Sequence, residues 1–321
     1  MVSLIMQAVL PMSHRKAALK RCNHALDQFA SVDASGWEQS FVHKGPNVDV
    51  FYASGRQHVN YMAVKLKTSN RQDLISRHLL QRWLNPQEHD VVEVHCSIKP
   101  ASMDHFILAL VQQDLAVSLK QERYDLKTFT RACNRGQLPA TLIALGDGAM
   151  QAGVLDRLLT EPVLHGLTSF EGALEYVILT DQPDEEPKLD DFPADTNLTV
   201  DSVYPERRLI VRARITSAQA VETITRTAIE LALFLVDFVS GMQVASDVRM
   251  KSIKQRQVEV DRLQKEKLKK LQEDAQRLKV EREKEMRDKL DQLPREQRRK
   301  LEERELKKKQ KRRSQVKLMK I

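Results

Sequence analysis

The chain has 321 residues, of which 52 are Lys or Arg, 44 are Asp or Glu and only 5% are aromatic. Its net charge of +8 is divided unevenly: residues 249–321 hold 28 basic and 14 acidic side chains, whereas the preceding 248 residues hold 24 and 30. A basic tail on an acidic body indicates an anionic partner for the tail, either nucleic acid or an acidic membrane surface. Cys22, Cys96 and Cys133 form no CxxC pair, so we expect buried thiols in a reducing compartment rather than a disulfide framework or a zinc knuckle.

Residues 1–48 form an N-terminal segment. Their start, MVSLIMQAVLPM (1–12), is apolar but shorter than the roughly 20 residues that a membrane span needs. Its positive charges follow the apolar run, as at the cytosolic end of a membrane helix, whereas a signal peptide carries them before it. The sequence leaves open whether this start is the remnant of a membrane span. Apolar residues at helical spacing then predict an amphipathic helix over 13–30.

Residues 49–245 predict a globular domain. Apolar runs, several of them alternating with polar residues, predict strands at 50–56, 59–68, 91–98, 105–112, 174–180 and 207–215. Helical spacing predicts helices at 71–84, 113–121, 155–164 and 217–239, while 141–145 fits either structure. Because strands in sequence-adjacent pairs are separated by helices, we predict an α/β (α+β) fold with a mixed, largely antiparallel sheet and packed helices.

An acidic stretch follows the strand predicted at 174–180. Residues 181–197 contain three prolines, seven acidic residues and one lysine, which predicts a solvated loop. Its acids lack the regular spacing that folds a loop around one Ca²⁺ ion, so we expect weak Ca²⁺ binding at most.

Residues 246–321 form a tail that differs in kind from the body. From Arg249 onward it has no glycine, no aromatic residue and one proline, Pro294. Several acid-before-base pairs at i,i+4, such as Glu266–Lys270 and Glu273–Arg277, favour a solvated helix. The leucines are too sparse for a sustained heptad stripe, which favours a single long helix over a dimeric coiled coil. We predict a helix that runs for about 65–70 Å before it bends near Pro294.

Motifs that carry chemistry are scarce. GDGAMQAG (146–153) does not have the GxGxxG spacing, so it predicts a turn into a helix rather than a phosphate site. The nine histidines include no HxxxH or HExxH arrangement, and no GxSxG or HxE…CxxC occurs. We therefore predict a binding protein without enzymatic activity, cofactor or metal centre. An enzyme whose site is assembled from scattered residues stays an alternative, and it predicts a deep pocket lined by convergent polar groups.

The basic end of the tail is the strongest positive signal. Residues 298–320 hold twelve basic side chains against three acidic ones. With no aromatic residue nearby to stack on bases, contacts with nucleic acid should go to phosphates and be insensitive to sequence. The lack of Trp, Phe or Tyr also disfavours insertion into a membrane surface. The predicted ribosome- or RNA-binding residues are Lys307, Lys308, Lys309, Lys311, Arg312, Arg313, Lys317 and Lys320.

Body and tail together resemble the calumin family. The resemblance lies in Ser54-Gly55-Arg56, in VKLK (64–67), in RQDLI (71–75) and in the basic end KKKQKRRSQVKLMKI (307–321), and it extends from about residue 15 to the C-terminus. Members are single-span endoplasmic reticulum proteins with a cytosolic α/β domain and a charged C-terminal helix, and they form the PAT complex with a small partner called Asterix. Residues 1–12 are all that stands in place of the span, and a truncated gene model would account for this.

The resemblance implies a translocon-associated adaptor and intramembrane chaperone subunit on the cytosolic face of the endoplasmic reticulum membrane. Such a protein assists the insertion of multipass membrane proteins beside the Sec channel and touches the ribosome through its tail. The family is also linked to Ca²⁺ binding and homeostasis, through an acidic lumenal segment that has no counterpart in these residues. The alternative is a soluble ribosome- or RNA-associated factor with no membrane role.

Overall fold

The computed structural model describes residues 38–43, 48–68, 89–133, 138–170, 172–188, 198–204, 206–215 and 220–291. The chain divides into two compact units, Met1–Val260 and Asp261–Ile321, each of which is described by itself. The helices predicted at 13–30 and 71–84, and the bend predicted near Pro294, lie outside the described residues. The division into segments 1–48, 49–245 and 246–321 stays a prediction.

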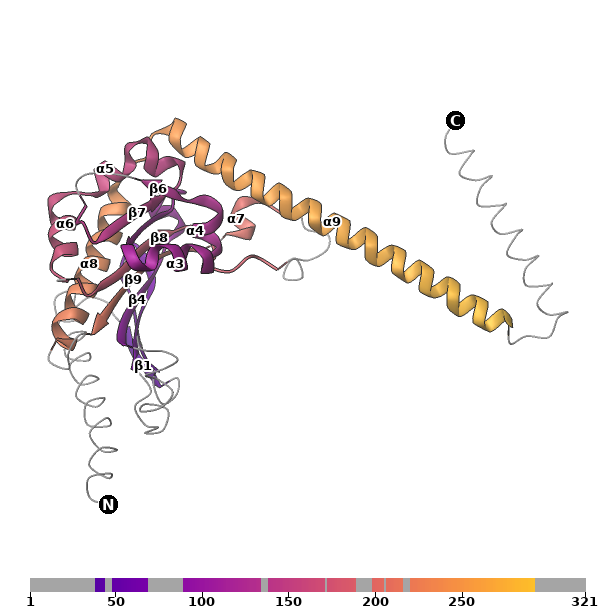
Figure 1. The fold of residues 1–321 in the computed structure, drawn as a ribbon, viewed down its shortest axis with the longest axis horizontal. Coiled ribbons are helices and arrows are strands. Elements are labelled where there is room, and N and C mark those ends of the chain that lie inside the picture. Colours follow the sequence, from indigo (N-terminus) through magenta and orange to yellow (C-terminus); the bar gives the residue numbers. More distant parts are fainter. Residues whose placement is uncertain are drawn as a thin grey trace, which may run out of the picture. The chain divides into compact units, whose positions relative to one another are not determined.

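Nine strands form one sheet in the part of the chain that the structure describes, in the order β1-β2-β3-β4-β9-β8-β5-β7-β6 (Figure 1). Every neighbouring pair is antiparallel, which confirms the predicted α/β class with a largely antiparallel sheet. The strands are β1 (Glu38–His43), β2 (Val48–Ser54), β3 (Val59–Lys67), β4 (Asp90–Ile98), β5 (Leu108–Gln112), β6 (Arg131–Cys133), β7 (Leu142–Gly146), β8 (Leu174–Thr180) and β9 (Arg207–Ile215).

The strands predicted from apolar patterns are confirmed with small shifts. β8 and β9 have the predicted bounds, and the ambiguous run at 141–145 is the strand β7. β5 begins at Leu108, three residues later than predicted. β1 and β6 were not predicted, because one lies in a polar stretch and the other has only three residues.

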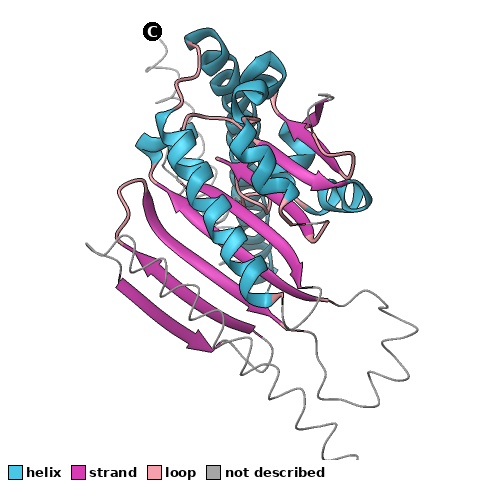
Figure 2. Ribbon diagram, turned by 90° about the vertical axis from the view of Figure 1, so that its left-hand side faces the viewer, coloured by secondary structure: helices cyan, strands magenta, loops and turns pink. Residues whose placement is uncertain are grey.

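One face of the sheet carries the larger hydrophobic core. The helix α8 (Val221–Gly241) lies across this face (Figure 2) and buries eleven of its residues, including Ile229, Leu235 and Val236. Alternate residues of β4, such as Val92 and Val94, are buried in the same core. Each fully buried aliphatic side chain contributes roughly 1.5–3 kcal/mol, so this face dominates the stability of the body.

The opposite face is covered over β5 and β7 by two short helices, α3 (Ala116–Glu122) and α4 (Tyr124–Phe129). Leu126 and Phe129 of α4 are buried with Ile107 and Leu145 in a second, smaller core. α3 follows a single 3-10 turn, η3 (Gln113–Leu115), and together they confirm the helix predicted at 113–121. α4 was not predicted, nor was α7 (Val200–Val203).

The segment GDGAMQAG forms the predicted turn into a helix. Asp147 Oδ1 accepts hydrogen bonds from the backbone N–H groups of Ala149 at 3.0 Å and Met150 at 3.3 Å, so its side chain caps the turn. A Cβ at Gly146 would lie 2.4 Å from Cβ of Met150, which explains why a glycine ends β7. The chain continues through the π-helical turn η4 (Met150–Val154).

The helix predicted at 155–164 is two helices instead of one. α5 (Leu155–Leu158) ends before Thr160, and α6 (Glu161–Thr168) begins with a proline in its first turn. Pro162 has no N–H to donate to the carbonyl of Leu158, and its ring clashes with a preceding helical turn. A proline is well tolerated in the first turn of a helix, so a new helix, α6, begins there.

The helix α9 (Ser246–Asp291) has 46 residues, which confirms a long C-terminal helix. Its first turns belong to the Met1–Val260 unit, where Ser252, Arg256 and Val260 are buried. The charge pattern from Arg249 onward predicts a solvated helix. That interpretation is wrong for these turns, because residues four apart lie on one helix face and here that face packs into the body.

Candidate functional site

The predicted ribosome-binding residues lie beyond Asp291 and therefore outside the described residues. Their roles stay a prediction. The predicted site residues are Lys307, Lys308, Lys309, Lys311, Arg312, Arg313, Lys317 and Lys320.

The described part of the Asp261–Ile321 unit is a charged helix. Arg262 Nη1 lies 2.7 Å from Glu266 Oε1, and Lys269 Nζ lies 3.9 Å from Glu273 Oε1. Both pairs place the base before the acid, the reverse of the pairs noted in the sequence. Exposed pairs of this kind contribute about 0–1 kcal/mol each, so they support helicity without fixing a tertiary contact.

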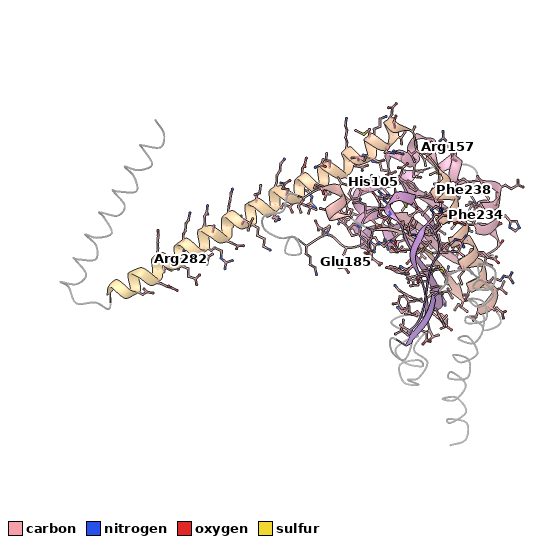
Figure 3. The ribbon with its side chains drawn as sticks, turned by 180° about the vertical axis from the view of Figure 1, so that it is seen from behind. His105, Arg157, Glu185, Phe234, Phe238 and Arg282 are labelled. Carbon is pink, nitrogen blue, oxygen red and sulfur yellow. The ribbon has the colours of Figure 1, made fainter. Side chains whose placement is uncertain are left out.

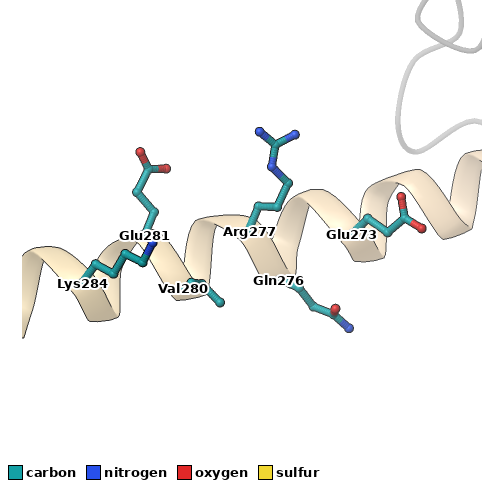
Figure 4. Close-up of a pocket in the computed structure, with 6 residues that line it drawn as sticks. All are labelled: Glu273, Gln276, Arg277, Val280, Glu281 and Lys284. Carbon is teal, nitrogen blue, oxygen red and sulfur yellow. The ribbon is translucent and has the colours of Figure 1, made fainter.

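The described residues that line one cavity of about 730 Å³ all belong to α9 (Figure 4). Glu273, Arg277, Val280 and Lys284 are among the lining residues, and Figure 4 shows that the side chains point in several directions from one helix. A binding site needs groups that converge on a ligand from more than one side, and these described residues of one helix do not converge in that way.

The most highly charged buried group of the body is the Arg256 cluster, which consists of Arg256, Asp181, Asp147 and His105. Arg256 donates from Nε to Asp181 Oδ2 at 2.5 Å, and from Nη2 to Asp181 Oδ1 at 2.7 Å and to Asp147 Oδ2 at 3.1 Å. His105 Nδ1 lies 2.9 Å from Asp181 Oδ2. The side chains of Arg256 and Asp147 are 0% exposed and that of Asp181 is 1% exposed.

The sheet topology brings these residues together. Asp147 follows β7 and Asp181 follows β8, and both strands run antiparallel to β5, which lies between them. Their carboxyl ends therefore meet at one edge of the sheet, where His105 precedes β5. The solvated loop predicted at 181–197 is wrong at its start: Asp181 and Gln182 are each 1% exposed. Arg256 offsets the cost of burying the Asp181 carboxylate.

Burial acts to raise the pKa of both carboxyl groups, but their net pKa shifts have opposite directions. Burial alone would raise the pKa of Asp181, but the charge of Arg256 and the hydrogen bonds from His105 and Arg256 hold that pKa below its ordinary value. At Asp147 burial outweighs Arg256 and, together with the charge of Asp181, raises the pKa. The cluster thus holds one firmly ionised carboxylate and one that ionises less readily.

The Arg256 cluster fixes the first turns of α9, and its Arg256, Asp147 and Asp181 side chains are closed to solvent. Side chains that are only 0–1% exposed cannot contact a ligand from solution. The guanidinium instead connects α9 to the ends of two core strands. Arg256 Nη1 also donates to the carbonyl oxygen of Ser252 at 3.0 Å, and its guanidinium lies 5.8 Å from the ring centroid of Phe129. The cluster is therefore a structural feature of the body.

Sequence reasoning missed the Arg256 cluster. A signal was present for its acids, because Asp147 and Asp181 each come directly after an apolar strand. No comparable signal marked Arg256, which is one of 28 basic residues in a segment that reads as uniformly charged. Only the packing of α9 distinguishes it.

A second polar group lies on the sheet face opposite α8. His95 Nε2 hydrogen-bonds Glu93 and lies 3.2 Å from Lys65 Nζ. Burial would raise the pKa of Glu93, but the hydrogen bond from His95 and the charges of His95, Lys65 and Arg212 lower it.

The helix α8 carries an exposed aromatic pair. Phe234 is 40% exposed and stacks on Phe238 with ring centroids 6.2 Å apart (Figure 3).

The described residues contain no group of three or more His, Cys, Asp or Glu side chains that could hold a metal ion. Glu185 in the acidic loop is exposed (Figure 3), and the loop's remaining acids at 190–195 lie outside the described residues. Cys96 and Cys133 are buried free thiols as predicted, while Cys22 lies in the part that is not described. Burial raises the pKa of the Cys96 thiol to about 12, which keeps it protonated.

Across the described residues, no single helix is long and apolar enough to cross a membrane. The helix α8 and the Ser246–Glu285 part of α9 meet that criterion only when they are taken together as a bent pair.

The described residues thus combine an antiparallel α/β body with a long charged C-terminal helix. The family model described as PAT complex subunit CCDC47 matches residues 14–312. The chain belongs to this family, which confirms the resemblance found in the sequence. No curated protein sequence matches the chain.

Members of this family are non-catalytic adaptor subunits with a role in membrane-protein biogenesis in the endoplasmic reticulum. Membership in it implies partnership with other subunits of the PAT complex.

Proposed function

We propose that the protein is a non-enzymatic adaptor and intramembrane chaperone subunit of the translocon. It acts on the cytosolic face of the endoplasmic reticulum membrane and assists the insertion of multipass membrane proteins. Its partners are a small Asterix-like membrane protein, the Sec channel and the ribosome. Family membership supports the assignment to membrane-protein biogenesis, and the charge distribution supports the contact with the ribosome.

The observation that carries the ribosome contact is the separation of charge along the chain. Residues 249–321 have an excess of 14 positive charges, whereas the rest has an excess of 6 negative charges. An anionic ribosome surface attracts the first and repels the second. The basic residues concentrate in 298–320, where twelve of them face three acids, so the end of the tail makes the phosphate contacts.

The composition of the tail also defines how it recognises RNA. No aromatic residue follows Arg249, so bases cannot be read by stacking. Lysine and arginine contacts to phosphates are independent of sequence and release counterions, which makes binding steeply dependent on salt. The tail therefore binds a surface of ribosomal RNA rather than one sequence motif.

Co-sedimentation of the full chain with purified ribosomes across a salt series tests this proposal. Removing 295–321 should abolish pelleting with ribosomes, and reversing Lys308, Lys311, Arg312 and Arg313 to Glu should have the same effect. About six phosphate contacts predict a log–log salt slope of roughly −4 to −5 for the intact protein.

A matched control reverses Lys251, Lys254, Lys265 and Lys270 to Glu, four exposed bases of α9 that precede the basic end. This variant should retain most of the binding. If the truncated protein pellets as well as the intact one, the basic end is a solvated charge run, and another surface has to contact the ribosome.

A further inference from the structure

The body has an open apolar pocket that neither the Arg256 cluster nor the basic tail uses. It has a volume of about 420 Å³ and lies between α3 and the β6–β7 edge of the sheet. Ala132, Ile143 and Leu145 come from the two strands, and Ala116 and Val117 come from α3. Pockets of about 300–1,000 Å³ with mainly apolar walls are typical of ligand sites, and this one has room for one or two bulky side chains.

Val117 is the exposed large hydrophobic residue of the pocket. Its exposed fraction is 69%, although it stands in a helix whose neighbour Ala116 is 7% exposed. The pocket is thus left uncovered by the described part of the chain. Covering Val117 and the apolar walls with a partner's side chain would remove this apolar surface from water, which favours a complex.

The strand beside the pocket is an edge strand. β6 pairs with β7 through Arg131–Gly146, Ala132–Leu145 and Cys133–Ala144, and it is the last strand in the sheet order. No other described strand pairs with its outer edge. Edge strands present backbone N–H and C=O groups in a row, and an extended peptide binds them by adding one strand.

The rim of the pocket is basic. Lys120 of α3 and Lys127 of α4 line it, and Arg131 of β6 is exposed next to Ala132. No carboxylate of the described residues pairs with these three side chains, whereas the nearby Arg123 is paired with Asp125 at 2.9 Å. The unpaired charges favour an acidic ligand.

We propose that this pocket docks an acidic, extended peptide segment of a partner protein, which places a bulky apolar side chain against Val117 and Leu145 and adds a strand to β6. Apolar walls with a lysine rim would also suit the acyl chain of an anionic lipid. The edge of β6 favours a peptide, because its backbone groups are satisfied by another strand and not by a hydrocarbon chain.

The test uses the full chain and a fluorescein-labelled peptide with a central phenylalanine, a valine on each side and two glutamates at each end. Fluorescence anisotropy should show saturable binding, and Val117→Glu should raise the Kd at least tenfold. Val258→Glu is the matched control, because Val258 is also 69% exposed but lies on α9 outside the pocket. Circular dichroism melting curves verify that each variant is folded.

A charge swap gives a second, independent readout. Lys120→Glu with Lys127→Glu should weaken the acidic peptide at least tenfold and strengthen a peptide in which lysines replace the glutamates. The pair Lys251→Glu and Lys254→Glu, exposed bases elsewhere in the body, should do neither.

Three outcomes would overturn the proposal. One is equal affinity across all variants, and another is the absence of saturable binding. The third is binding to phosphatidylserine vesicles, sensitive to Val117→Glu, in the absence of peptide binding. Because no ribosome is present in this assay, its failure is distinct from a failure of the ribosome contact.

Discussion

Arg256 and Arg262 lie six residues apart on α9 and show how differently one side chain behaves in two settings. Arg256 is 0% exposed and contacts Asp181 at 2.5 Å, whereas Arg262 is 40% exposed and contacts Glu266 at 2.7 Å. The distances are similar, but the consequences of losing each partner are not. Removing one partner of a buried pair leaves an uncompensated charge in the protein interior, whereas water solvates the survivor of an exposed pair.

The largest effect is expected for Arg256→Met, which keeps the apolar bulk of the side chain but removes its charge. Asp181 and Asp147 then stay buried without their cation, so the free energy of unfolding should fall by about 3–5 kcal/mol. Guanidinium unfolding followed by circular dichroism measures this change. A loss below about 1 kcal/mol would mean that the cluster is hydrated in solution and that the contrast with Arg262 fails.

The second prediction concerns acid. The pKa of Asp181 is lowered on folding, so its contribution to stability is present above the ordinary carboxyl pKa, about 3.9, and is lost as the pH falls through the lower, folded-state value. Asp181→Asn should therefore lose stability at pH 7 and show a shallower further loss below about pH 4 than the parent protein.

Asp147→Asn is the control for the acid experiment. The pKa of Asp147 is raised on folding, so its contribution is largest below the ordinary carboxyl pKa and declines as the pH rises through the raised value. Asparagine also keeps an oxygen that can cap Ala149 and Met150. Asp147→Asn should consequently cost less at pH 7 than Asp181→Asn. Denaturant midpoints of both variants at pH 7, 5, 4 and 3 show which substitution costs more stability at each pH.

The smallest effect is expected for Arg262→Met, the same substitution at the exposed position. It removes one exposed i,i+4 pair, so the change should stay within about 1 kcal/mol, measured in the same guanidinium assay. A cost as large as that of Arg256→Met would show that position 262 contributes far more than its exposed pair does.

The sequence predicted the fold where apolar patterns are long and regular. β8 reads LEYVILT and β9 reads RRLIVRARI, and both were placed with the correct bounds. β6 could not be predicted in the same way, because Arg131 and Ala132 are exposed and three residues carry no periodicity. The break between α5 and α6 was in principle predictable from Pro162, whose position inside an apolar helical pattern marks a boundary.

The candidate sites were less predictable than the fold. The Arg256 cluster depends on two carboxylates brought to one sheet edge by β7 and β8, and strand order is not encoded in any local pattern. The pocket depends on α3 standing over β6 and β7, so Val117 and Lys120 reveal nothing until those elements are placed. Charge composition, by contrast, is readable directly, and for that reason the basic tail was the one functional region predicted from sequence.

The sheet order has a consequence for synthesis. β9 is the last strand of the sheet to be translated, yet it lies between β4 and β8 and joins the hairpin half β1–β4 to the half made of β8, β5, β7 and β6. Contacts between residues far apart in sequence form late and slowly. In a nascent chain that emerges from the exit tunnel, the two half-sheets therefore stay unjoined until 207–215 has appeared. Asp181 cannot form its ion pair before Arg256 has also been synthesised. Completion of the body is thus timed to the emergence of the helix that leads to the basic end.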